Sequence, residues 1–81
     1  MMIEKEQIEG KLRGAFNNAA HIEVRDMTGT QDHFEVTIVD PAFKGKSLVE
    51  RHQLVYQALG AWVGREIHAL ALSTYDPEQW T

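Results

Sequence analysis

The spacing of the apolar residues changes along the chain, and this change limits the fold more than any other feature. In residues 2–19 they recur every three or four positions, as in an amphipathic helix, at Ile8, Leu12, Ala15, Phe16 and Ala19. From His21 to Met27, and again from His33 to Ile38, apolar and polar residues alternate, which predicts two half-buried strands. The polar segment 28–32 between them predicts a turn, so the strands should form an antiparallel hairpin.

The second half of the chain predicts another helix and another strand. Asp40-Pro41 should end the second strand, because proline has no N–H to donate to a ladder. Ser47 and Glu50 have the spacing of a capping box, so a helix should begin there. Its apolar face is expected to hold Leu48, His52, Val55, Leu59 and Trp62, with Gly64 as the residue that ends it.

The end of the chain predicts a third strand and the start of a further helix. Ile67 to Thr74 is short and apolar enough to be a buried strand, and Asp76-Pro77 has the pattern of a helix start. The element order therefore predicts an α+β fold, αββαβ(α), as a two-layer sandwich. A right-handed crossover between the second and third strands would give a mixed three-stranded sheet. With 81 residues, the chain is expected to form a single domain, 1–81.

Composition excludes several classes of function. The chain has no cysteine, which removes disulfides, thiol catalysis and any metal site built on its own thiolates. It has no triad-like serine, phosphate loop or dinucleotide fingerprint, so we do not expect an enzyme. The formal net charge of −4 disfavours the wrapping of nucleic acid. No apolar run is long enough to span a membrane, and the charged N-terminal segment is unlike a signal peptide, so a cytoplasmic protein is expected.

Two sets of side chains are candidates for binding. The histidines provide neutral imidazole, a common metal ligand, at His21, His33, His52 and His68. Their separations match no local metal motif, and each position alone is more typical of a structural or surface residue. His52, for example, is expected to donate to a carbonyl in the core. The second set surrounds the start of the second helix, where a phosphate could dock, and comprises Lys44, Lys46 and Arg51.

Several segments from Asp32 onward resemble the BolA family. They are Phe43-x-Gly45, Arg51-His52-x-x-Val55-Tyr56, His68-Ala69-Leu70 and Thr74-Tyr75-x-Pro77-x-x-Trp80. They occur in the family's order, and the resemblance covers nearly all of the chain. It implies a BolA-like fold, similar to a class II KH domain, which agrees with the element order predicted from the residues.

The resemblance also implies a function. BolA proteins pair with monothiol glutaredoxins, and the heterodimer can hold a bridging two-iron two-sulfur cluster used in iron-sulfur cluster trafficking or iron homeostasis. A glutaredoxin cysteine and a glutathione thiol would supply two ligands, so this chain would need to supply only imidazole. By position, His68 matches the family's C-terminal cluster histidine. For the second ligand the nearest imidazole is His33, with Asp32, water or no second ligand as alternatives.

The resemblance leaves other partners open. Some bacterial BolA proteins are described as DNA-binding transcription regulators of stress response and morphology, and on this alternative Lys44, Lys46 and Arg51 would contact phosphates. The sequence lacks the G-x-x-G clamp of true KH modules. Further alternatives are a contact with glutaredoxin in which no cluster is shared, and a weak homodimer.

Overall fold

A computed structural model describes residues 3–27, 29, 33–67 and 69–80 of the chain. The described residues form an α+β domain, as the sequence predicts. Its helices and strands are α1 (Lys5–Ala15), β1 (His21–Asp26), β2 (His33–Val39), α2 (Leu48–Leu59) and β3 (Ala69–Tyr75). Short 3-10 turns occupy Pro41–Phe43 and Gly60–Trp62. Within these ranges, no helix has the length and apolar character needed to cross a membrane.

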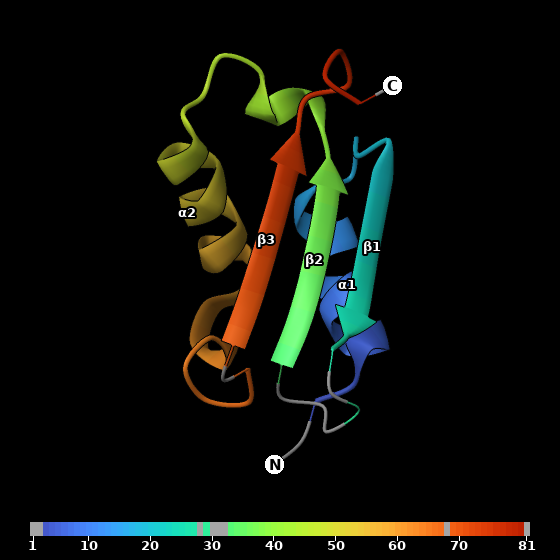
Figure 1. Ribbon diagram of the computed structural model, residues 1–81, viewed down its shortest axis with the longest axis vertical. Coiled ribbons are helices and arrows are strands. Elements are labelled where there is room, and N and C mark those ends of the chain that lie inside the picture. Colours follow the sequence, from blue (N-terminus) through green and yellow to red (C-terminus); the bar gives the residue numbers. More distant parts are fainter. Residues whose placement is uncertain (1–2, 28, 30–32, 68, 81) are drawn as a thin grey trace.

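The three strands form one mixed sheet in the order β1-β2-β3 (Figure 1). β1 and β2 pair antiparallel, whereas β2 and β3 pair in parallel through a crossover that contains α2. Both pairings are those predicted from the sequence. β2 is therefore the central strand, and β3 lies at one edge of the sheet.

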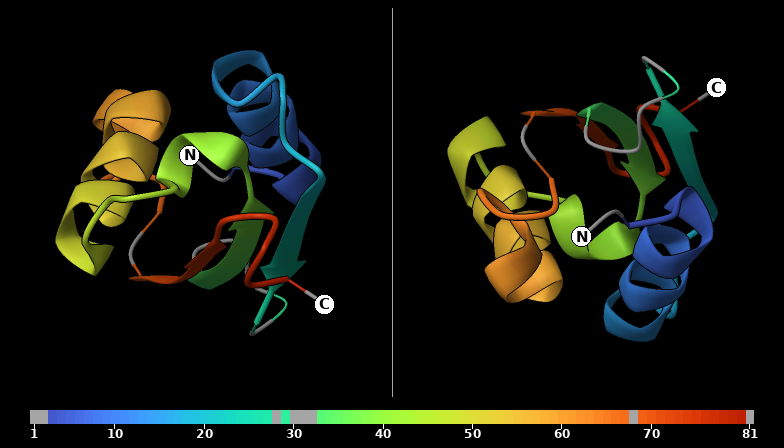
Figure 2. Two further views of the ribbon diagram at one scale, coloured as in Figure 1. Left: turned by 90° about the horizontal axis from the view of Figure 1, so that it is seen from above. Right: turned by 90° about the horizontal axis from the view of Figure 1, so that it is seen from below.

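Both helices pack on the same face of the sheet, so the fold has two layers and leaves the other sheet face open (Figure 2). Alternate residues of the strands point into the space between the layers, where they meet the apolar stripes of the helices. The buried core includes Ile8, Leu12, Phe16, Ile22, Val24, Phe34, Val36, Ile38, Phe43, Val55, Leu59 and Ile67. The sequence predicts a buried β3, but Ala69 and Ala71 are exposed because no second layer covers the open face.

α2 begins where the sequence predicts and ends earlier. Its capping box is complete, because the Glu50 N–H donates to Ser47 Oγ at 3.2 Å and the Ser47 N–H donates to Glu50 Oε1 at 2.8 Å. The prediction that Gly64 ends the helix is wrong. Gly60, with φ of 61°, is the C-cap, because it is the first residue after the helix start that adopts a positive φ without strain.

The buried face of α2 also differs from the prediction at its first turn. Val55 and Leu59 are buried as expected, but Leu48 is 61% exposed and Arg51 is only 9% exposed. The Arg51 guanidinium donates from Nε to the Lys46 carbonyl at 3.1 Å and from NH1 to the Thr74 carbonyl at 3.2 Å. The carbonyl groups of Lys46 and Thr74 need donors, because buried polar groups are normally hydrogen-bonded. The first turn of α2 therefore buries Arg51 and leaves Leu48 exposed.

The segment after β3 forms a turn at residues 77–79 where the sequence predicts the start of a helix. Asp76 Oδ1 accepts from the Glu78 N–H at 2.8 Å and from the Gln79 N–H at 3.1 Å, as a helix N-cap would. The Gln79 side chain, however, folds back, and its Oε1 accepts from the Asp76 N–H at 3.0 Å and from Arg51 NH1 at 2.9 Å. These bonds close the turn.

We expect Arg51→Met to destabilise the fold. The substitution keeps most of the side-chain volume but leaves the buried Thr74 carbonyl without its donor, so the free energy of unfolding should fall by about 1–3 kcal/mol. Urea denaturation measures this change. Arg65→Met is the matched control because Arg65 is exposed, and an equal effect of the two substitutions would contradict the role given to Arg51.

The capping box predicts a specific pH dependence of stability. Hydrogen bonds from the backbone N–H and the hydroxyl of Ser47 hold the pKa of Glu50 below its ordinary value of 4.5. The carboxylate therefore stabilises the fold fully above pH 4.5, and this contribution is lost as the pH falls through the lower folded pKa. In urea denaturation, Glu50→Gln should be less stable than the wild type at neutral pH and equally stable in acid. A difference that persists in acid would contradict this account.

Candidate functional site

His33 stands at the start of the central strand, on the open face of the sheet. Its neighbour Phe34 is fully buried in the core, so alternation along the strand directs the half-buried His33 the other way. The His33 carbonyl accepts from the Met27 N–H at 2.9 Å, which continues the hairpin ladder one step beyond β1. In the parallel pair, His33 lies opposite Ala69, the first residue of β3.

The other expected cluster ligand, His68, lies outside the described residues, as does Asp32. In the sequence, His68 directly precedes Ala69, the ladder partner of His33. No group of three or more metal-ligating side chains is gathered among the residues that the structure describes. The donor set in that part of the chain therefore fits one imidazole ligand of a shared site and not a complete metal site.

Side chains next to His33 leave room on the open face. Ala69 and Ala71 are exposed and carry only methyl groups, and the register sets them opposite His33 and Glu35. Glu35 is held by Arg25, whose NH1 lies 3.1 Å from Glu35 Oε1. A partner approaching this part of the face would therefore meet small side chains and an ion pair.

Two further histidines have structural surroundings. His21 is half-buried, and its ring stacks on Trp80 at a centroid distance of 5.3 Å and an interplanar angle of 18°. Its Nε2 lies 3.6 Å from Glu23 Oε1. His52, which was expected to donate to a carbonyl, is half-buried on α2, and its Nε2 is buried with no hydrogen-bond partner in the described part of the chain. The expected donation is thus not found at this nitrogen.

Sequence reasoning missed the aromatic cluster that His21 joins. Trp80 also contacts Tyr75, with ring centroids 5.2 Å apart. The register explains the meeting, because His21 and Tyr75 are both ladder partners of Val39, on opposite sides of β2. Residues so far apart in the sequence give no local signal, and only the strand order predicts their contact.

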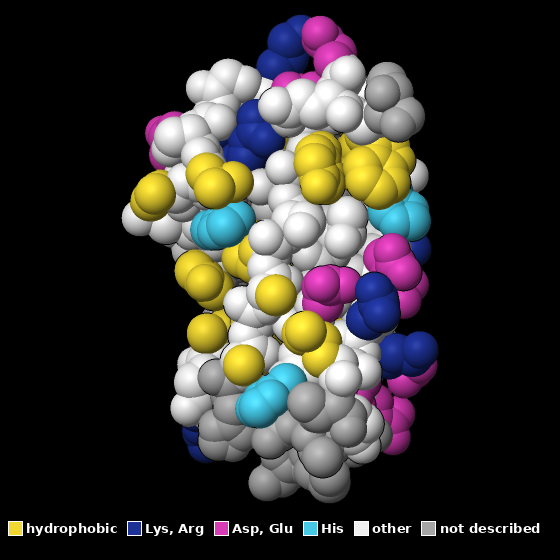
Figure 3. Space-filling view, in the orientation of Figure 1, with side chains coloured by type: hydrophobic (Ala, Val, Ile, Leu, Met, Phe, Trp, Pro, Cys, Tyr) yellow, Lys and Arg dark blue, Asp and Glu magenta, His cyan; other side chains and the backbone are white. Residues whose placement is uncertain are grey.

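The basic turn before α2 is largely engaged within the protein. Lys44 forms an ion pair with Glu78, and this hydrogen-bonded carboxylate raises the pKa of the lysine. Arg51, expected to contact phosphate, is buried and bonded to the protein's own carbonyl groups, so it serves the fold. Lys46 is exposed, and no ion pair is recorded for it among the described residues. Figure 3 shows basic and acidic side chains together at the upper end of the molecule.

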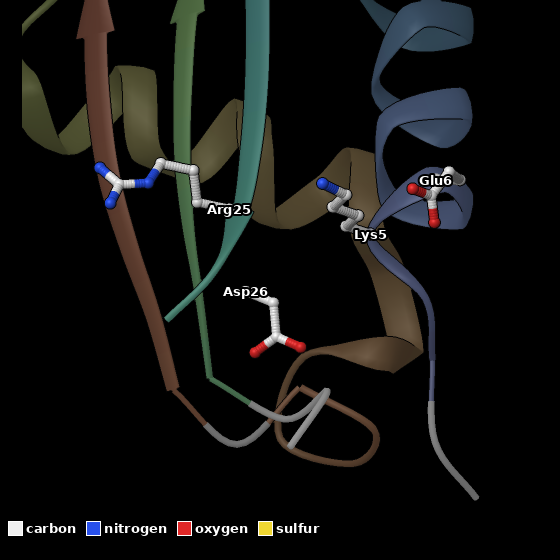
Figure 4. A pocket seen from close by; sticks show the side chains of 4 residues that line it. All are labelled: Lys5, Glu6, Arg25 and Asp26. Carbon is white, nitrogen blue, oxygen red and sulfur yellow. The ribbon is translucent and has the colours of Figure 1, made fainter. Parts of the chain in front are cut away.

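A hollow between the start of α1 and the end of β1 is lined by Lys5, Glu6, Arg25 and Asp26 (Figure 4). Two cations and two carboxylates line it, so neither sign of charge prevails. Arg25 extends across the sheet, away from Lys5 and Glu6, and Asp26 Oδ1 accepts from the Gly29 N–H at 2.9 Å. The mixed charges of this hollow and the hydrogen bond of Asp26 favour no particular class of ligand.

The fold and these side chains define a class of protein: a small two-layer αββαβ domain with a histidine where its central strand begins. Comparison with known proteins then identifies the family. A family model described as "BolA-like protein" matches residues 13–79. The chain therefore belongs to the BolA family.

Individual relatives agree with this assignment. The chain is 36% identical over 86 residues to "DNA-binding transcriptional regulator BolA" of Escherichia coli (strain K12), covering 98% of this chain and 81% of that protein. It is 41% identical over 81 residues to "Protein BOLA2" of Arabidopsis thaliana, covering 98% and 85%. Among solved structures, the "BolA domain of SufE1 from Arabidopsis thaliana" matches with a TM-score of 0.84 at 32% identity, covering 93% of each chain.

Proposed function

We propose that the protein is a non-enzymatic BolA-family adaptor that binds a monothiol glutaredoxin and shares a bridging two-iron two-sulfur cluster with it, in iron-sulfur cluster trafficking or iron homeostasis. The observation that carries the proposal is the parallel register of β2 and β3. It sets His33 opposite Ala69, the residue that follows His68 in the sequence. The chain thus carries two imidazoles, that of His33 at the start of β2 and that of His68, which directly precedes β3 in the sequence.

The donor chemistry supports a site shared between two proteins. The chain has no cysteine, so thiolate ligands have to come from the partner and from glutathione, and imidazole is this chain's contribution. The bound cluster supplies iron and electron-transfer chemistry. A histidine can ligate only when the ligating nitrogen is unprotonated, so cluster binding should weaken in acid.

The shape of the sheet supports a partner on its open face. Both helices lie on the other face, and the exposed β3 residues beside His33 and Glu35 are alanines. The similar structure titled the BolA domain of SufE1 shows that this fold also occurs as part of another protein. Both observations fit a domain that works beside a second protein.

A reconstitution experiment tests the proposal. Mixed with a monothiol glutaredoxin, iron, sulfide and glutathione, the protein is expected to form a coloured heterodimer whose visible circular dichroism spectrum differs from that of the glutaredoxin homodimer. His68→Ala and His33→Ala should each change that spectrum, because each removes an iron ligand. His21→Ala is the matched control, since His21 starts β1 at the opposite end of β2 from His33 and should leave the spectrum unchanged.

The outcomes separate the function from the ligand assignment. If no heterodimer forms, the proposed function fails. If the heterodimer forms and neither His68→Ala nor His33→Ala alters its spectrum, the adaptor role stands and the two histidines are not the ligands. Size-exclusion chromatography of each mixture reports the heterodimer independently of its colour.

DNA binding is a second candidate, and the name printed for the E. coli relative favours it. In this chain the basic turn offers Lys46, which has no recorded intramolecular ion pair in the described part, at the start of a 12-residue helix. Lys44 is paired with Glu78 and Arg51 is buried, so these two cations should contribute less than Lys46 to the binding of a phosphate.

Salt dependence tests the DNA candidate. If Lys46 contacts a phosphate, Lys46→Ala should weaken binding and lower the slope of log K against log salt concentration by about 0.9. Lys5→Ala, at the hollow near the other end of the molecule, is the control that should leave the slope unchanged. Fluorescence anisotropy with labelled duplexes measures both, and no binding at physiological salt would remove this candidate.

A further inference from the structure

Most of α2 and all of β3 carry no formal charge. A quarter of the whole chain is charged, yet α2 from His52 onward and all of β3 contain no Asp, Glu, Lys or Arg. These two elements are neighbours, with β3 at the edge of the sheet and α2 beside it in the helix layer (Figures 1 and 2). The cores of protein interfaces are depleted of charged residues in the same way.

The same side exposes an apolar stripe on α2. Leu48, Val49 and Tyr56 are 61%, 66% and 42% exposed, and His52 lies between them on the same helix face. Figure 3 shows hydrophobic side chains around a histidine at this edge of the molecule. Single exposed apolar residues are ordinary, but a contiguous group of them indicates a contact surface.

The backbone of β3 adds a free strand edge. The Tyr75 carbonyl accepts from the Asp40 N–H at 3.1 Å and so faces β2, whereas the Thr74 carbonyl accepts from Arg51 and faces outward. Because these directions alternate along a strand, Leu70 and Leu72 also point their N–H and C=O groups outward. In the described part of the chain, no hydrogen bond is recorded for these outward groups.

From Leu70 to Leu72 this edge lacks the features that usually prevent strand pairing. Natural edge strands carry Lys or Pro, bulge, are very short, or are covered by a helix or loop. In β3 a helix residue, Arg51, binds the outward carbonyl of Thr74. β3 is seven residues long, has the sequence ALALSTY, and pairs with β2 in an unbroken register. An edge of this kind is able to accept another strand.

Symmetry and charge favour a second copy of the chain as the occupant. An antiparallel pair of identical strands is related by a twofold axis, so the edge of β3 can serve as the contact surface of both copies. Two copies with a net charge of −4 repel each other least where neither carries a charge. The edge that is open for pairing is short, so the contact should be smaller than the ~800 Å² per partner of a standard interface. A dimer on this side would therefore be weak.

We propose that the protein forms a twofold-symmetric homodimer through the edge of β3, beside the α2 stripe, with the axis at Ala71. In this register, Leu70 of one copy lies opposite Leu72 of the other, and each exchanges both its N–H and its C=O. Every outward group of these two residues is then paired. Ala71 meets its own counterpart in a non-hydrogen-bonded pair, where the Cα atoms are only ~4.5 Å apart and a methyl side chain fits.

Charge substitutions at Ala71 test the axis directly. In analytical ultracentrifugation, the average mass of the wild type should rise from 9.2 kDa toward twice that value between about 10 μM and 1 mM. Ala71→Lys and Ala71→Glu should each weaken the dimer by more than about tenfold, because like charges then face each other across the axis. An equimolar mixture of the two variants should restore the dimer. Ala71 is exposed on the open face, so neither side chain disturbs the core.

Controls make each result decisive. Gln57→Lys adds the same charge to a different face of α2 and should leave dimerisation unchanged. Amide exchange gives a second measurement on the wild type: the Leu72 N–H should become more protected as concentration rises, whereas the Ala71 N–H, which faces β2 in both states, should not. A wild type that stays monomeric to 1 mM, an Ala71→Lys variant that dimerises normally, or a mixture that stays monomeric would each overturn the proposal. These mixtures contain no glutaredoxin or metal, so the result is independent of the proposed function.

Discussion

The guanidinium of Arg51 joins the start of α2 to the end of β3 and the final turn, 23 and 28 residues away. It donates to a carbonyl just before α2, to the last outward carbonyl of β3, and to the side chain that closes the final turn. The position of α2 against β3, the path of the last residues and the exposure of Leu48 all follow from this one buried cation. A charged group is tolerated there because backbone oxygens at the end of the core would otherwise lack donors.

The central strand β2 determines which surface residues of β1 and β3 lie close together. β2 is antiparallel to one neighbour and parallel to the other, so its two ends gather different residues. At its start, His33 meets the first residue of β3, and at its end Val39 brings His21 and Tyr75 into one aromatic cluster with Trp80. The two histidines therefore have different surroundings. His33 lies beside small exposed residues, whereas the ring of His21 stacks on Trp80.

Local signals in the sequence predicted most of the fold, and the failures have physical causes. Periodicity placed both helices and all three strands, and the Ser47–Glu50 spacing located the start of α2. Leu48 was misplaced because helical periodicity counts apolar residues and cannot tell that the core needs a donor at this point. The final turn was read as a helix because Asp76 does cap its backbone, while Gln79 closes the turn through a contact with Arg51, 28 residues away. For the candidate site, the sequence proposed His33, and only the register shows which residue of β3 lies beside it.

The two proposed partners would use adjoining parts of the same strand. A glutaredoxin that shares a cluster near His33 would approach the open face around Ala69, whereas a second copy would pair along the edge from Leu70 to Leu72. One surface points away from the helices and the other points sideways, yet they meet within two residues. Two partners bound so close together would exclude one another. This effect is reciprocal: dimerisation weakens the binding of glutaredoxin by the same factor by which glutaredoxin weakens dimerisation. A weak homodimer would then cover the uncharged edge of β3 when no partner is bound and dissociate when a tighter partner binds.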